Sequence, residues 1–256
     1  MHDDLTACAD LVRRADPDRF LAAMAAPVAA RRVLFPIYAF NVEVARAPWV
    51  TQEPMIAEMR LQWWRDALDE IGSGGKVRRH EVVTPLADVL DNDGAALLDQ
   101  LIVARRWDIY KDPFEDDAHF IDHMEKTAGN LMLTAARALG DADTQVVQNA
   151  GYAHGLANWL RAIPELEKAK RIPLLDGRPD AIRALAADGL ERLKNARRER
   201  SQISKNAHAA MIPLWQTRAV LQRAHQNPHN VAEGCLTPAP FRSRLSLMAR
   251  TLSGRW

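Results

Sequence analysis

Residues 55–71 read MIAEMRLQWWRDALDEI, and their apolar side chains recur at the spacing of an α-helix. One stripe contains Ile56, Met59 and Trp63, and a second contains Leu61, Trp64, Leu68 and Ile71. Recurrence at three and four positions places each stripe along one side of a helix. Because two stripes make a wide apolar face, we expect this helix to be enclosed on more than one side.

The same periodicity extends over most of the chain, and alternating strand patterns are nearly absent. We predict helices near residues 3–14, 18–25, 28–46, 54–71, 80–91, 95–110, 116–139, 144–161, 179–204, 207–225 and 241–251. Pro36 and Pro213 fall inside helical patterns, and each is expected to kink or break its helix. No composition break marks a linker. We therefore expect an all-α chain with a single domain over residues 1–256.

The charge of the chain is balanced overall but unevenly distributed. Its 256 residues carry a formal net charge of +1, which gives no general attraction to nucleic acid. Residues 1–180 carry 21 basic and 29 acidic side chains, whereas residues 181–256 carry 13 basic and 4 acidic ones. The basic C-terminal part is either a solvated helix face or a surface that meets something anionic.

The chain shows no sign of secretion or membrane insertion. Cys8 and Cys235 lie far apart and have no metal or redox spacing, which is typical of a reduced cytosolic protein. The N-terminus, Met1 to Asp4, is acidic and is followed by no apolar run, so we expect no secretory signal, and no stretch approaches the about 18 consecutive apolar residues of a membrane span. We expect a cytoplasmic protein that can lie at the inner face of a membrane.

Two histidines offer the best metal spacing in the chain, but it is incomplete. His119 and His123 are four residues apart and share a helix face, yet Phe120 stands where a zinc protease would have its glutamate. No further ligand is evident. The sequence favours two histidines on a polar helix face and predicts no metal site.

Three segments, in this order, carry a recognisable pattern. They are residues 31–43 (RRVLFPIYAFNVE), 59–65 (MRLQWWR) and 155–162 (GLANWLRA), the last followed by KRIPL at 170–174. Together they resemble the squalene/phytoene synthase family, most strongly over residues 18–205. The resemblance implies an isoprenoid-synthase-like helical bundle around a central cavity, with residues 206–256 forming basic C-terminal helices.

Active members of that family hold magnesium through two Asp-x-x-x-Asp motifs that face each other across the cavity. Laid on that pattern, the first pair falls at Ala45 and Trp49 and the second at Ala162 and Leu166. No carboxylate remains at these four positions, so we expect no cofactor and assign no catalytic residue. The departures resemble a diverged branch of the family that includes a mitochondrial complex I assembly factor.

The resemblance also suggests which residues form a site. The candidates for binding a phosphate or other ligand are Arg46, Asn158, Arg161, Lys168, Lys170 and Arg171. The candidates for lining the cavity are Tyr38, Phe40, Asn41, Ala45, Trp63, Gly151, Gly155 and Ala162. Small residues recur along one face of helix 144–161, where they allow either tight helix packing or close approach of a ligand.

Three functions remain open. The first is a non-catalytic or altered family member that binds a prenyl or other lipid, or assists assembly of a membrane complex. The second is an active prenyl transferase that condenses prenyl diphosphates and would need magnesium. The third is a helical interaction protein whose cavity has filled.

The C-terminal segment bears on the choice between a membrane surface and a soluble partner. Leu245, Met248 and Leu252 form one apolar stripe, with Arg242 and Arg244 nearby. Such a stripe either lies in a membrane interface or packs on the protein's own bundle.

Overall fold

The computed structural model describes the backbone of residues 2–256, and the side chains of all of these except residues 2, 3, 240 and 242. The described part is all-α apart from one isolated bridge between Ala142 and Ile203. The first seven α-helices, with a short 3₁₀ helix after the third, are α1 (His2–Ala15), α2 (Pro17–Ala25), α3 (Val28–Arg46), η1 (Ala47–Trp49), α4 (Pro54–Gly72), α5 (Val83–Ala87), α6 (Asn92–Arg105) and α7 (Trp107–Tyr110). The remaining elements are α8 (Asp117–Met124), η2 (Glu125–Gly129), α9 (Asn130–Arg137), α10 (Thr144–Lys168), α11 (Pro179–Arg198), η3 (Arg200–Gln202), η4 (Ala207–Trp215), α12 (Thr217–Gln226), α13 (His229–Ala232) and α14 (Pro240–Ser253).

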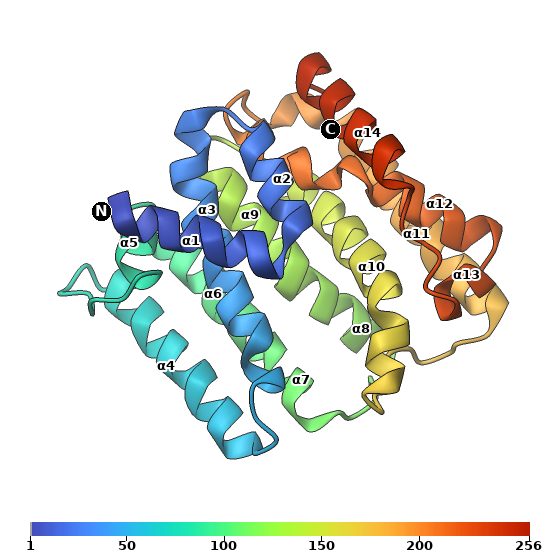
Figure 1. Cartoon of the computed structure of the whole chain (residues 1–256), viewed down its shortest axis with the longest axis horizontal. Helices are drawn as coiled ribbons and strands as arrows, with labels where there is room; N and C mark the ends of the chain where they lie inside the picture. Colours follow the sequence, from blue (N-terminus) through green and yellow to red (C-terminus); the bar gives the residue numbers. More distant parts are fainter. Residues whose placement is uncertain (1) are drawn as a thin grey trace.

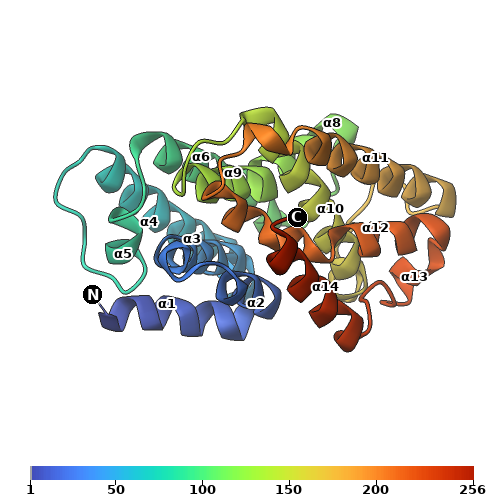
Figure 2. The same cartoon turned by 90° about the horizontal axis from the view of Figure 1, so that it is seen from above.

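The helices pack around α10, which crosses the middle of the bundle (Figure 1). α10 contacts η2, α9, α11 and α12. Seen from above, α1 to α6 occupy one end of the molecule and α11 to α14 the other (Figure 2). One apolar core joins the two ends, because buried side chains from Cys8 to Trp256 belong to the same packed cluster. The all-α bundle predicted from periodicity is thus confirmed.

Prolines inside helices do not break the two helices that bound the centre of the molecule. α3 continues through Pro36, and α10 continues through Pro164 to Lys168, beyond the predicted end at residue 161. A proline removes one helical hydrogen bond and crowds the preceding turn. Most of each helix is buried, and the apolar packing offsets that cost. Of the two outcomes expected at Pro36, a kink or a break, the break does not occur.

The helix predicted over residues 116–139 is interrupted by a π turn, η2, between α8 and α9. Its backbone lies directly on the small-residue face of α10. A Cβ atom at Gly151 would come within 2.6 Å of the Gly129 Cα, and one at Gly155 within 2.6 Å of the Ala128 Cβ. The small residues therefore serve tight packing first, which only glycine permits at these two positions.

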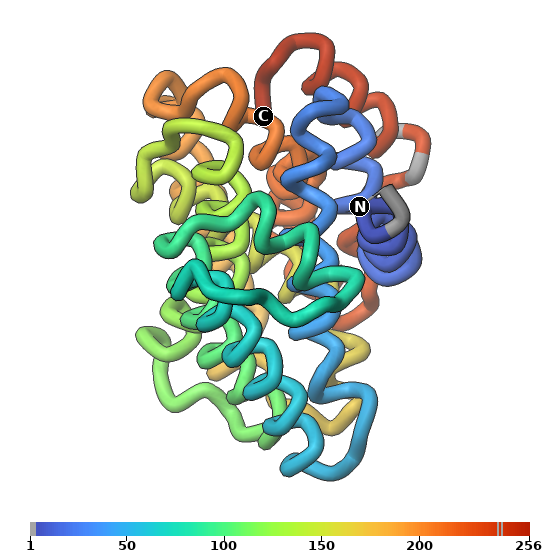
Figure 3. The backbone as a smooth tube through the Cα atoms, turned by 90° about the vertical axis from the view of Figure 1, so that its left-hand side faces the viewer, coloured from blue at the N-terminus to red at the C-terminus, as the bar shows by residue number. Residues whose placement is uncertain are grey.

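The C-terminal region departs most from the predicted helices. The helix expected over residues 207–225 begins as the 3₁₀ segment η4, which contains Pro213, and becomes α-helical only at Thr217. α14 packs on η4 and α2, so that the last helix of the chain lies beside the second (Figure 3).

α14 turns its apolar stripe outward. Leu245, Met248 and Leu252 expose 48%, 59% and 86% of their surface, so the stripe does not pack on the bundle. Its opposite face is held to the protein, where Ser246 donates a 3.1 Å hydrogen bond to the Trp215 carbonyl and Leu247 is buried. Arg242, which the sequence places beside the stripe, lies outside the described side chains.

Within the described residues, no helix is both long enough and apolar enough to cross a bilayer.

Candidate functional site

A cavity of about 220 Å³ lies where α3, η1, η2 and α10 converge. Trp49, Ala162 and Leu166 all line it, and these are three of the four positions where the family pattern places metal-binding aspartates. The fourth, Ala45, is half-buried and lies outside the lining. The two former motif segments thus face one cavity, and their side chains there are apolar.

The chain that follows α10 turns back into this cavity. Lys170 adopts a left-handed conformation (φ 61°), with its N–H bonded to the Glu167 carbonyl at 2.8 Å. The Arg171 N–H then bonds to the Leu166 carbonyl at 3.0 Å, which completes the paired bonds of a Schellman C-cap. Trp159 anchors the loop further by donating to the Pro173 carbonyl at 2.8 Å. The reversal places Arg171 at the mouth of the cavity.

The Arg171 guanidinium lies against Trp49, one of the four positions where the family pattern places an aspartate. Its Cζ is 4.7 Å from the centre of the Trp49 ring, in cation–π contact. Its Nη2 donates to the Asp108 carbonyl at 2.5 Å, while its Nε is buried and has no hydrogen-bond partner. Burial lowers the pKa of Arg171 from its ordinary value because the charged form has lost water. The positively charged Arg171 side chain therefore lies near the positions where the family pattern places its magnesium-binding aspartates.

Behind Arg171 lies a small buried ion-pair cluster. Arg105 Nη1 contacts Asp108 Oδ2 at 3.0 Å, and His123 Nε2 lies 3.9 Å from Asp108 Oδ1. Burial lowers the pKa of His123 to about 4, so the ring is neutral near pH 7. The expected polar helix face was wrong for His123, because Trp107 and Phe114 enclose its ring at 5.3 and 5.5 Å.

The residues of the cavity do not suit magnesium. Mg²⁺ prefers several hard oxygen ligands and usually takes one or two carboxylates together with substrate phosphates. Here Asp108 is the one carboxylate among the described lining residues, and it is already paired with Arg105. Arg19, Arg105 and Arg171 bring positive charge to the same walls. Among the described side chains, no group of three or more His, Cys, Asp or Glu residues could hold a metal.

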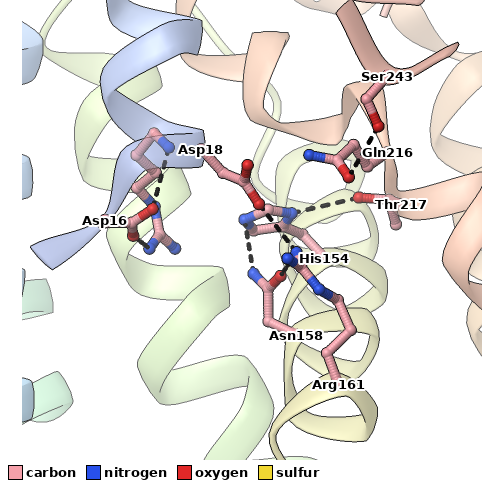
Figure 4. Close-up of polar contacts among 9 residues, drawn as sticks. Asp16, Asp18, His154, Asn158, Arg161, Gln216, Thr217 and Ser243 are labelled. Atoms are coloured by element: carbon pink, nitrogen blue, oxygen red, sulfur yellow. Dashed lines mark hydrogen bonds and ion pairs between the residues drawn. The ribbon is translucent and has the colours of Figure 1, made fainter. Parts of the chain in front are cut away.

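A polar network connects the cavity to α2 and to the C-terminal helices (Figure 4). Asn158 lines the cavity, and its amide contacts His154 Nε2 at 3.0 Å, while His154 Nδ1 contacts Thr217 Oγ1 at 3.2 Å. Burial lowers the pKa of His154 to about 3, so this histidine too is neutral near pH 7. Arg161 points to α2 instead, where it pairs with Asp18 at 2.9 Å.

The predicted binding residues therefore separate into two groups. Asn158 and Arg171 line the cavity, together with the predicted lining residues Asn41, Gly155 and Ala162. Outside it lie Arg46, which pairs with Glu43 on the surface, and the exposed Lys168 and Lys170. A ligand in the cavity would not contact these three cations, and the role of Lys170 is to form the turn.

The remaining predicted lining residues are used for packing. Phe40 is fully buried against Trp64, with ring centres 5.4 Å apart, and Tyr38 is buried nearby on α3. Trp63 does not line the cavity. The Arg78 guanidinium stacks on its ring, with 4.9 Å between the Arg78 Cζ and the ring centre. Gly151 meets η2. The expected apolar wall of Tyr38, Phe40, Trp63 and Gly151 therefore lies outside this cavity.

Several lining residues were not predicted from the sequence as part of the site, among them Arg19, Arg105 and Trp159. Arg105 stands three residues before Asp108, a spacing that allows an ion pair on one helix face. Trp159 lies within the third family-like segment, next to Asn158. Arg19 carries no local signal, because its position depends on how α2 docks against α3.

The comparisons with known proteins agree with this geometry. A profile of the squalene/phytoene synthase family matches residues 12–174. The chain belongs to the squalene/phytoene synthase family. Its membership rests on a match over more than half of its length.

Two relatives within the family share a described role. The NADH dehydrogenase (ubiquinone) complex I, assembly factor 6 homolog of Drosophila melanogaster is 30% identical over 178 residues, covering 65% of this chain and 53% of the relative. Assembly factor 6 of Bos taurus is 24% identical over 180 residues, covering 64% and 51%. The chain thus spans about half the length of these curated relatives and is their distant homologue.

Solved structures of enzymes share the fold. A dehydrosqualene synthase in complex with ligand superposes with a TM-score of 0.80 at 16% identity, covering 99% of this chain and 96% of the enzyme. A squalene synthase from Alicyclobacillus acidocaldarius superposes with a TM-score of 0.68 at 18% identity, covering 88% and 94%. The chain therefore has the isoprenoid-synthase-like fold.

Proposed function

We propose that this chain is a non-catalytic family member that binds a phosphate-bearing lipid headgroup in its central cavity and assists assembly of a membrane complex. One observation supports the proposal: Arg171 stacks on Trp49 in a cavity where Ala162 and Leu166 stand at the positions of the second aspartate pair. Ionising a prenyl diphosphate needs a metal to stabilise the departing charge. An arginine can hold phosphate oxygens without a metal.

The cavity suits a headgroup better than a pair of prenyl chains. Its volume of about 220 Å³ is below the ~300–1,000 Å³ typical of pockets that enclose a drug-sized ligand. Arg105 and Arg171 each keep a buried Nε without a hydrogen-bond partner, which supports an acidic ligand between them. Phe40 and Trp64 pack on each other and do not line the cavity, so they offer no apolar extension of it. The tail of a bound lipid would lie outside.

The assembly role is supported by the assembly factors of Drosophila melanogaster and Bos taurus, whose names state it. Their matches cover 65% and 64% of this chain. We infer that the partner is a subunit of a membrane complex.

The test compares turnover with binding. Purified chain is incubated with farnesyl or geranylgeranyl diphosphate and magnesium, and released pyrophosphate and squalene- or phytoene-sized products are measured. Calorimetry then measures binding of pyrophosphate with and without magnesium, for the wild type and Arg171→Met. We expect no turnover, binding that magnesium does not strengthen, and loss of binding in the variant.

Other outcomes would separate the alternatives. Turnover, or affinity that rises with magnesium, would establish the active prenyl transferase instead. Absence of pyrophosphate binding, together with no lipid in the mass spectrum of the purified protein, would favour a helical interaction protein with a filled cavity.

A further inference from the structure

A second cavity, of about 470 Å³, lies between the C-terminal end of α2, the start of α3, η4 and α14. Its apolar lining residues include Ala26, Pro27, Val28 and Ile212. Its basic lining residues are Arg31, Lys205, His208, Arg250 and Arg255. No Asp or Glu occurs among the described residues that line it, so no acidic side chain balances the basic ones within the cavity.

Two donors in this cavity lack partners. The Nε of Arg250 and the Nε1 of Trp256 are both buried and make no hydrogen bond to the described residues. A buried donor left unpaired costs about 1–3 kcal/mol, more when the group is charged. Both donors would be satisfied by acceptor oxygens placed between them.

Arg250 also faces other arginines. Arg197 of α11 and Arg218 of α12 lie within its electrostatic reach, and the described part of the chain shows no ion pair to any of the three. Burial, followed by repulsion from Arg250 and Arg218, lowers the pKa of Arg197 to about 10. Like charges brought together without a counter-ion oppose folding, and a bound anion would relieve them.

The outer surface next to this cavity is apolar. Val28, on the cavity rim, is exposed, as are Leu245, Met248 and Leu252 on the outer face of α14. Arg250 follows Met248 by two residues, about 200° around the helix, and so points inward. α14 therefore presents apolar side chains to the outside while it holds a cation over the cavity. Apolar faces flanked by basic groups are typical of helices that lie in a membrane interface.

We propose that this cavity, the α14 cavity, binds the phosphate headgroup of an anionic phospholipid while the outer face of α14 lies in the bilayer interface. Arg250, Arg255 and the Trp256 N–H contact the phosphate, and Val28 and the stripe of α14 contact acyl chains. The residues that line the α14 cavity and those that line the central cavity are different. The proposal for the α14 cavity therefore does not depend on the proposed function of the central cavity.

The test uses the full chain and co-sedimentation with phosphatidylcholine vesicles, with and without phosphatidylglycerol. We expect binding only when phosphatidylglycerol is present. Arg250→Gln should weaken it on the order of 30-fold, because both charge and headgroup hydrogen bonds are lost. The matched control is Arg244→Gln, which removes one charge from an exposed position of the same helix. It should weaken binding about fivefold, as expected for about 1 kcal/mol per basic residue near an anionic surface.

Further arms separate the sources of phosphate and the two cavities. Trp256→Phe removes the N–H and keeps a smaller aromatic ring, and should weaken vesicle binding without unfolding the protein. Inorganic phosphate should compete poorly with vesicles, since it lacks the acyl contacts, whereas soluble dihexanoyl phosphatidylglycerol should compete well. Arg171→Met should bind vesicles like the wild type, so that failure of one site leaves the other testable.

Clear outcomes would overturn the proposal. Equal losses in Arg250→Gln and Arg244→Gln would show general charge attraction without a headgroup site. Absence of wild-type binding to phosphatidylglycerol vesicles would leave the outer face of α14 as a contact for a protein. As a check on folding, Arg250→Gln should not lower the thermal unfolding midpoint, because it removes repulsion from Arg197 and Arg218.

Discussion

Arg171 and Arg250 both have a buried Nε without a partner, and burial lowers the pKa of both, yet their surroundings differ. Arg171 rests on Trp49, bonds to the Asp108 carbonyl and belongs to a region of close packing around α10. Among the described side chains, Arg250 has neither an aromatic nor a carboxylate partner, and it faces other arginines beneath an exposed apolar helix face. The first arginine is held by the protein, whereas the second depends on something from outside.

Substitutions in the central region should therefore change both folding stability and pyrophosphate binding, whereas substitutions in the α14 region should change binding alone. The predictions below test that contrast, beginning with the largest expected effect.

Gly151→Ala should lower the free energy of unfolding by about 3 kcal/mol. The added Cβ would come within 2.6 Å of the Gly129 Cα, and backbone on both sides would have to shift. Chemical denaturation measures the change. Gly177→Ala is the matched control, since its Cβ would meet nothing within 4 Å, and it should change stability by less than about 0.5 kcal/mol. Equal effects would show that η2 is not packed on α10.

The second test is the free energy of unfolding as a function of pH. His123 and His154 have folded-state pKa values of about 4 and about 3, against about 6.5 in the unfolded chain. Because the unfolded state binds protons first, stability is fully present above pH 6.5 and falls as the pH drops toward 4. The slope should approach two protons, about 2.7 kcal/mol per pH unit. His154→Gln should remove about half of it, and an unchanged slope would contradict a buried neutral His154.

Arg171→Met should lower the free energy of unfolding by about 2 kcal/mol, because the contact with Trp49 and the bond to the Asp108 carbonyl are both lost. Thermal and chemical unfolding measure it. Arg178→Met, in the same loop, serves as the control. Arg178 is exposed and pairs only with Asp176, so this change should cost less than about 1 kcal/mol. If Arg171→Met were as stable as the wild type, Arg171 would resemble Arg250 in not contributing to folding stability.

Leu252→Gln should have the smallest effect on folding, within about 0.5 kcal/mol, since 86% of the Leu252 surface is exposed. The same change should weaken binding to phosphatidylglycerol vesicles, since it removes apolar contact with the bilayer. Vesicle co-sedimentation and denaturation of one preparation measure both quantities. A loss of stability without a loss of vesicle binding would assign the stripe to packing.

Much of the fold could be predicted from the sequence because helical periodicity is a local property. The stripes of residues 55–71 predict α4, and the family-like segments locate the two helices that face the cavity. The absence of carboxylates at Ala45, Trp49, Ala162 and Leu166 is likewise read directly from the chain. The continuation of α3 through Pro36 could not be predicted, because helix propensity is a local property. The packing that stabilises α3 despite this proline depends on distant residues.

What the tertiary structure alone decided is which side of each helix meets which partner. Trp63 is turned away from the cavity while Arg19 is brought to it, and no local pattern distinguishes them. The C-cap at Lys170 directs Arg171 onto Trp49, a contact across more than a hundred residues of chain. The outward direction of the apolar stripe of α14 depends on how this helix packs against η4 and α2. The sequence thus determined the helices and the loss of the metal ligands, and long-range packing decided where the remaining charges lie.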